Sequence, residues 1–218
     1  REAETSLFRC DVDRATACVE QSLALDPDQA QALEVQAYLL IAEGAITDAM
    51  RLVGILRANE VAPPALVAIA QAWVEAGGMA TTAFLESTAA ACLRRGFGHV
   101  AYALVEGKAF TDLCSDHLRE AWNRPDVELR YLSRPLLTKP FLDLAVRGEH
   151  GSVDLAPLRG LPVGAIDIAG LVPENLHTLA LGPVRSVTFR NSVLADLSDL
   201  KGLDIWSLTL DGVSVTNI

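Results

Sequence analysis

Hydrophobic positions follow two different periods along the chain. In the first part apolar residues recur every three or four positions, as in Ala32 to Ala42 and Thr47 to Leu56, which predicts paired amphipathic helices. The turn between them is Glu43-Gly44, and Pro27 ends the preceding helix. In the last third apolar residues alternate over short stretches, which predicts strands. We therefore expect an α+β chain, an array of helical hairpins followed by a short parallel β-solenoid.

The helical part repeats at 34 residues. Ala15 maps to Ala49 and then Ala83, with Ala37 in the middle of the first helix of the best copy and Pro27 closing the unit before it. This pattern resembles the tetratricopeptide repeat family, in which small residues let the two helices of a pair approach closely. The consensus Trp and Leu-Gly are missing, and Gln71 replaces the small residue in the next copy. The resemblance covers residues 10–97, and an ordinary alanine-rich helical bundle is the alternative.

The last third repeats at 21 residues, and a weaker copy precedes it at 22 with Phe141, Leu144, Val146 and Gly148. Three columns are apolar and the fourth is glycine or asparagine: Val163, Val184 and Ile205; Ile166, Val187 and Leu208; Ile168, Phe189 and Leu210; Gly170, Asn191 and Gly212. This resembles the short bacterial type of leucine-rich repeat. The buried Asn of that family would fall on Leu171, Ser192 and Val213, so other groups must satisfy the loop backbone. Another parallel β-solenoid is the alternative.

These patterns divide the chain into three regions. We expect tetratricopeptide-like repeats over 1–97, a helical adaptor or cap over 98–140, and leucine-rich-repeat-like strands over 141–218. The adaptor contains predicted helices from His99 to Glu106 and from Phe110 to Trp122. The chain lacks an initial Met and stops inside a repeat unit, so we expect the natural protein to continue. Self-association through the uncapped C-terminal repeat is the alternative.

Composition narrows the class of protein. Half of the residues are hydrophobic while 6% are aromatic, which excludes a disordered chain. The net charge of -10 argues against a nucleic-acid partner, and no apolar run is long enough to insert into a membrane. Four cysteines are too few for a disulfide framework, and we expect Cys18 and Cys92 to be buried thiols in a cytoplasmic protein.

No set of residues typical of catalysis stands out, and we expect neither an enzyme nor a cofactor. The sequence has no nucleophile elbow, phosphate loop or dinucleotide fingerprint. Cys114 and His117 have zinc-ligand spacing, but no second ligand pair accompanies them, so no metal site is predicted. Asp196 and Asp199 are typical of turns and caps.

Binding surfaces can be located more easily than ligands. Polar side chains between the buried columns should share the concave face of the strands, and their alternating charge suits a peptide or protein partner: Arg147, Asp167, Thr188, Arg190, Thr209 and Asp211. A helical groove would present Gln31, Glu34, Tyr38 and Glu75. Trp73 and Trp206 are expected in the core. We expect a protein-recognition module of a larger bacterial signalling or defence protein, with a structural scaffold or oligomerisation module as the alternative.

Overall fold

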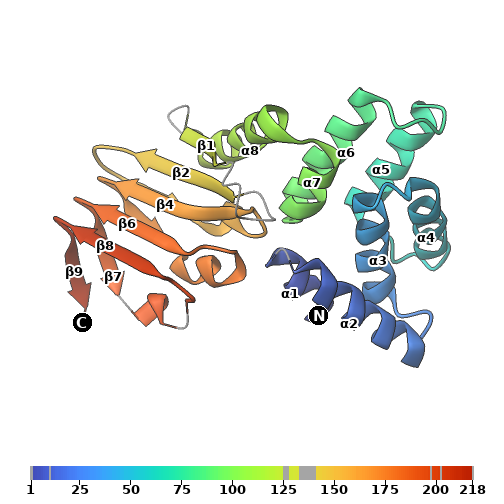
Figure 1. Cartoon of the computed structure of the whole chain (residues 1–218), viewed down its shortest axis with the longest axis horizontal. Coiled ribbons are helices and arrows are strands. Elements are labelled where there is room, and N and C mark those ends of the chain that lie inside the picture. Colours follow the sequence, from blue (N-terminus) through green and yellow to red (C-terminus); the bar gives the residue numbers. More distant parts are fainter. Residues whose placement is uncertain are drawn as a thin grey trace. The chain divides into compact units, whose positions relative to one another are not determined.

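The fold is that of two compact units, residues 1–106 and 107–218 (Figure 1). A computed structural model describes residues 2–9, 11–124, 128–132, 141–196, 198–201 and 203–217. It is 55% helical and 19% strand. Helices fill the first unit and parallel strands dominate the second, as the change in hydrophobic period predicts.

Seven helices are described in the first unit, and consecutive helices pack as hairpins (α1 on α2, α3 on α4, α5 on α6). The predicted helices over 32–42 and 47–56 are confirmed, and the turn between them contains Gly44 at φ +78°. A side chain there would be strained, which explains the glycine. The bounds are α1 Glu2–Phe8, α2 Val12–Leu25, α3 Ala30–Ala42, α4 Ile46–Ala58, α5 Pro64–Glu75, α6 Thr82–Arg95 and α7 Gly98–Leu104.

The alanines that recur every 34 residues are buried in two helices and exposed in the third. Ala15 in α2 and Ala49 in α4 are fully buried, whereas Ala83 in α6 is exposed. The buried positions of α6 lie one residue later than a 34-residue period would place them, since Phe84, Thr88 and Ala91 take the places of Ala49, Val53 and Leu56. One residue rotates a helix by roughly 100°, which turns Ala83 away from the buried side. The Thr81 hydroxyl caps α6 by accepting from the Phe84 amide at 3.2 Å.

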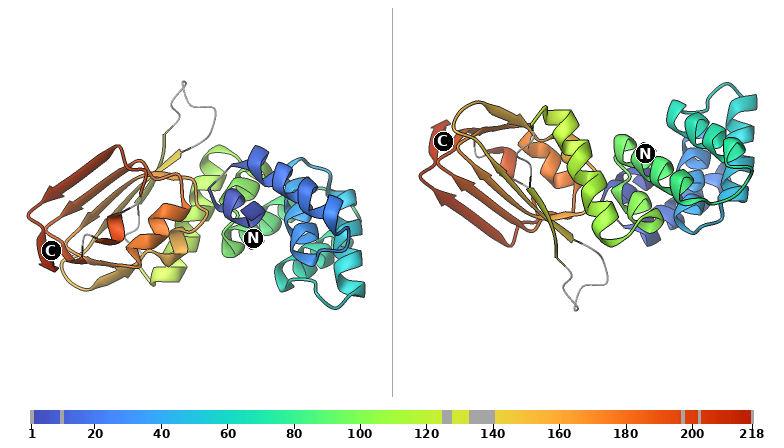
Figure 2. Two further views of the ribbon diagram at one scale, coloured as in Figure 1. Left: turned by 90° about the horizontal axis from the view of Figure 1, so that it is seen from below. Right: turned by 90° about the horizontal axis from the view of Figure 1, so that it is seen from above.

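The second unit is built on a five-stranded sheet of order β1-β2-β4-β6-β8, parallel except for β1 (Figure 2). Two short parallel pairs, β3-β5 and β7-β9, and three 3₁₀ segments complete it. The bounds are α8 Gly107–Trp122, β1 Glu128–Leu132, β2 Phe141–Arg147, β3 Ser152–Asp154, η1 Ala156–Leu158, β4 Val163–Ala169, β5 Val172–Glu174, η2 Leu176–Leu181, β6 Ser186–Arg190, β7 Val193–Asp196, η3 Ser198–Leu200, β8 Ser207–Asp211 and β9 Ser214–Asn217.

The 21-residue columns are the register of this sheet. Ile166 pairs with Val187, and Val187 with Leu208, so each column is a row of side chains crossing the strands. Between β2 and β4 the offset is 22, as expected, but only after an irregularity between Leu142 and Asp143. That irregularity puts Leu142 opposite Val163, where the sequence pattern places Phe141.

The glycine and asparagine column marks a left-handed turn after each strand. Gly170, Asn191 and Gly212 have φ values of +71°, +48° and +61°, a region that glycine and asparagine adopt most readily. A Cβ atom on Gly170 would lie 1.8 Å from the Gly148 carbonyl oxygen. The turns stack through backbone hydrogen bonds, including Gly170 N–H to the Arg190 carbonyl at 2.8 Å. Glycine at 170 is thus required by both conformation and space.

Polar side chains in the loops of the second unit form hydrogen bonds with the loop backbone and with one another. The buried hydroxyl of Ser192, at one of the expected Asn positions, donates to the Arg190 carbonyl at 3.1 Å. The Asn175 amide donates to the Asp154 carboxylate, 21 residues earlier, at 2.7 Å. Asp196 accepts from the Ser198 amide at 2.7 Å, which confirms it as a turn residue. The polar groups therefore repeat with the same period as the strands.

The segment expected as an adaptor contributes to both units. Its predicted helices are α7, which packs on α3 and α6 in the first unit, and α8, which contacts β1 and η1 in the second. The division between the units falls at Gly107, which has φ +65°. The helix-breaking prolines Pro135 and Pro140 lie outside the described residues.

Candidate binding surfaces

The expected helical groove is not an open surface. Tyr38 is fully buried, which corrects its assignment to a ligand-facing position. Gln31 is exposed but donates to Glu4 of α1 at 3.0 Å. Glu75 on α5 accepts from Gln71 of the same helix at 3.0 Å. These side chains therefore do not line one continuous groove along α3 and α5.

The corner between α6 and α7 fills the space beside α1 and α3. Phe97, at this corner, stacks on Phe8 of α1 with ring centroids 5.3 Å apart. The same ring meets Tyr38 of α3 edge-on at 4.5 Å. All three side chains are at most 1% exposed. The chain thus buries its own aromatic residue where the sequence pattern predicts a ligand groove.

Charged groups close the same corner. Arg95, at the end of α6, donates to Glu34 through Nε at 3.2 Å and through Nη2 at 3.0 Å, and to Glu4 at 3.0 Å. Its guanidinium also lies 5.4 Å from the Phe97 ring centroid. Burial would lower the pKa of Arg95, but Glu34 and Glu4 outweigh it and raise that pKa above its ordinary value. We name Arg95, Glu4, Glu34 and Phe97 the corner lock.

Buried polar groups near the corner lock carry no reactive chemistry. Within the described part of the chain, the Tyr38 hydroxyl is buried without a hydrogen-bond partner, and burial raises its pKa far above the usual value. Burial also raises the pKa of Cys92 to about 12. Cys92 is a buried thiol as expected, whereas Cys18 is partly exposed. A thiol with such a raised pKa is a poor nucleophile.

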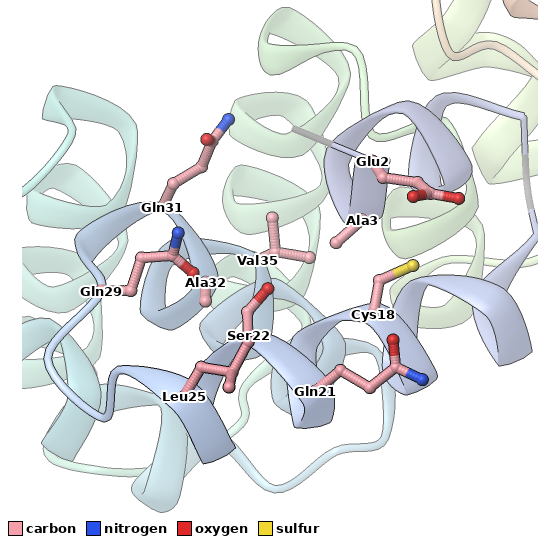
Figure 3. A pocket seen from close by; sticks show the side chains of 10 residues that line it. All are labelled: Glu2, Ala3, Cys18, Gln21, Ser22, Leu25, Gln29, Gln31, Ala32 and Val35. Atoms are coloured by element: carbon pink, nitrogen blue, oxygen red, sulfur yellow. The ribbon is translucent and has the colours of Figure 1, made fainter.

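A small depression lies among α1, α2 and α3 (Figure 3). Its volume is about 190 Å³, and its lining includes the Cys18 thiol, the Glu2 carboxylate and the amides of Gln21, Gln29 and Gln31. Glu2 is paired with Arg14 at 2.6 Å, and both are exposed. The depression brings together no acid-base pair and no group of converging charges, so it does not define a site.

The solvent-facing side of the second unit carries the predicted strand residues in ordered rows. We name the outward side chains of β2, β4, β6 and β8 the open face. One row is Ala145, Asp167, Thr188 and Thr209, and the next is Arg147, Ala169, Arg190 and Asp211. Each residue is at least partly exposed. The six residues predicted for this face therefore do lie together on one side of the sheet.

The charges on the open face are not all neutralised. Arg190 Nε lies 3.4 Å from Asp167 Oδ1, so the two central charges compensate each other. Within the described part of the chain, Arg147 on β2 and Asp211 on β8 have no ion-pair partner. Beside Arg147 is a shallow depression of about 530 Å³, lined also by Glu149, Ala169 and Asn191. Among the described residues, the row that contains Arg190 thus has an unpaired positive charge on β2 and an unpaired negative charge on β8.

The edge of the sheet is apolar and exposed. Trp206, expected in the core, is 82% exposed, and Leu208 and Leu210 are 45% and 42% exposed. The columns to which these leucines belong are buried in β4 and β6, but no other strand in the described part of the chain pairs with the second edge of β8. Arg185 lies over the Trp206 ring at 5.7 Å and is held by Asp204 at 3.0 Å. The sequence predicts an uncapped C-terminal repeat, but the prediction that Trp206 lies in the core is wrong.

No metal-binding cluster forms among the described residues, and none of the described helices could span a membrane. Cys114 is buried in α8, which raises the pKa of its thiol, and no further ligands gather around it and His117 in that part of the chain. Trp73 is half-buried against Phe84, with ring centroids 5.1 Å apart. Comparison of the chain with protein-family models, curated proteins and solved structures finds no match.

Proposed function

We propose that this chain is a protein-recognition module that binds its partner on the open face of the second unit. The observation that carries this proposal is the row of in-register side chains with Arg147 at one end and Asp211 at the other, neither of which has an ion-pair partner among the described residues. Exposed, unpaired charges at fixed spacing are suited to selecting a partner by electrostatic complementarity.

The spacing of the charges indicates the shape of the partner. Three strand separations of about 4.8 Å lie between β2 and β8, which places Arg147 and Asp211, at the two ends of the row, about 14 Å apart. Four residues of an extended chain cover about 13.6 Å. An extended segment crossing the strands with an acidic residue at one position and a basic residue four positions later would match both ends. Thr188 and Thr209, in the neighbouring row, offer hydroxyls to its backbone.

In this proposal the first unit is a tetratricopeptide-like array without an open groove for a ligand, because the side chains of the corner lock fill the position where the groove is expected. Its helical hairpins support the first resemblance, and the 21-residue register supports a leucine-rich-repeat-like second unit. Such a pair of repeat regions suits the recognition part of a larger signalling or defence protein.

The test is a selection of random peptides on the immobilised chain. We expect enrichment of peptides with an acid and a base four positions apart, and loss of their binding in Arg147→Glu and in Asp211→Lys. The matched controls Lys201→Glu and Glu174→Lys reverse exposed charges off the open face and should leave binding unchanged. Peptides that bind all four variants equally, or no enrichment at all, would refute the proposal.

A structural scaffold or oligomerisation module is the second candidate function. The exposed apolar edge of β8 favours it, because monomeric proteins seldom leave such an edge uncovered. The two functions use different surfaces of the second unit. Arg147→Glu, on β2, would impair recognition alone, whereas changing Leu208 or Leu210, which do not face the open side of the sheet, would impair assembly alone.

A further inference from the structure

We infer that the edge strand β8 pairs antiparallel with β8 of a second copy of this chain. Three of the nine large hydrophobic side chains that are exposed in the described residues lie on or next to this one strand: Trp206, Leu208 and Leu210. Among the described strands β8 pairs only with β6, so its other edge presents backbone groups that no described strand pairs. A strand added there would satisfy the backbone and cover the leucines at once.

The residues of β8 are complementary to themselves about Thr209. In an antiparallel pair with Thr209 opposite its own copy, Leu208 lies opposite Leu210, and Ser207 lies opposite Asp211. Threonine pairs and aliphatic pairs across strands are stabilising. The leucine pairs extend the two buried apolar columns into the second copy. The serine hydroxyl can donate to the opposite carboxylate.

The same register explains the exposed tryptophan. It places Trp206 opposite Gly212 of the second copy, and an aromatic ring across from a glycine covers backbone that has no side chain of its own. Arg185 and Asp204 already hold the ring in place, so little side-chain entropy is lost when it is covered.

Charge and symmetry favour this pairing over other contacts with a second copy. Asp211 is the only charged residue between Ser207 and Gly212, and the register keeps the two Asp211 residues about 14 Å apart. A two-fold contact closes on itself, whereas joining β8 to the opposite edge of the sheet would propagate into open filaments. Each copy carries a net charge of -10, so added salt should strengthen the dimer.

Sedimentation velocity over about 1–200 µM chain tests the inference, with an expected shift from 23.3 kDa toward twice that mass. Thr209→Lys places two ammonium groups opposite each other and should raise the dimer dissociation constant at least tenfold. Its matched control, Thr188→Lys, makes the same change in the same row on the interior strand β6 and should leave the mass unchanged.

A crosslink reports the register directly. Opposed residues of an antiparallel pair have Cα atoms about 4.5–5.5 Å apart, which suits a disulfide. Mild oxidation of Thr209→Cys should therefore yield a covalent dimer linked through position 209, and Thr188→Cys should not. A chain that stays monomeric at the highest concentration overturns the inference. So does a dimer that tolerates Thr209→Lys and forms no such link. Neither result bears on peptide binding at the open face.

Discussion

Replacing Arg95 by methionine should destabilise the first unit by about 2–3 kcal/mol. The guanidinium makes three charge-assisted hydrogen bonds to Glu4 and Glu34, whose side chains are 17% and 13% exposed. Removing one partner of a buried ion pair costs about 3–5 kcal/mol, because the remaining charge stays desolvated. The side chain of Arg95 is itself 33% exposed, so water screens part of this cost. We therefore expect a loss of about 2–3 kcal/mol, at or below the low end of that range.

The assay is urea unfolding followed by far-ultraviolet circular dichroism, in which the helices dominate. Arg94→Met is the matched control, since Arg94 is exposed and occupies the same last turn of α6, so both variants lose the same interaction with the helix dipole. We expect it to change stability by less than about 0.5 kcal/mol. Replacing Glu4 and Glu34 by leucine together with Arg95→Met should recover much of the loss. Equal effects of Arg94→Met and Arg95→Met would refute the reasoning.

Three further predictions concern thiols and turns. Since the pKa of Cys92 rises from 9.0 to about 12 on folding, its contribution to stability is complete below pH 9 and declines as the pH rises toward 12. Between pH 9 and pH 10.5 wild type should lose about 2 kcal/mol more than Cys92→Ala in pH-dependent urea titrations. The decline that remains in Cys92→Ala comes from other groups whose pKa folding raises, such as Cys114 and Tyr38. In the native protein a maleimide should modify Cys18 well before Cys92, as peptide mass mapping will show; equal rates would contradict the burial of Cys92. Gly170→Ala should destabilise the second unit by more than about 3 kcal/mol in thermal unfolding, because a Cβ would meet the Gly148 carbonyl oxygen, whereas Gly44→Ala, with open space and only an unfavourable φ, should cost about 1 kcal/mol; equal losses would contradict the steric argument.

Features governed by local periodicity could be predicted from the sequence. The α3–α4 hairpin follows from apolar spacing and a glycine turn, and the register of β4, β6 and β8 follows from the 21-residue columns. The same columns place Arg147, Asp167 and Arg190 on one face, because side chains alternate along a strand. Ala83 is exposed because the buried positions of α6 lie one residue later than a 34-residue period places them, a shift that a fixed period ignores.

Features that depend on distant partners could not be predicted. Tyr38 has the spacing of a groove residue, and only the arrival of Phe97, 59 positions later, buries it. Arg95 has no local signal that singles it out from Arg94. Leu208 and Leu210 belong to columns that are buried in β4 and β6, yet both are exposed because burial of a column requires a strand on both sides. An edge position carries the same sequence pattern as an interior one.

The corner lock also constrains the order in which the first unit can be completed during synthesis. Glu4 and its partner Arg95 are 91 positions apart, and Phe8 and Phe97 are separated by almost as much of the chain. A ribosome adding about 5–20 residues each second leaves α1 without its final neighbours for roughly 5–20 seconds. Arrays of repeats that contact only their neighbours can settle one unit at a time, but here the first helix must be held until the last has emerged. Until then Phe8 of α1 lacks the Phe97 ring against which it stacks in the folded chain.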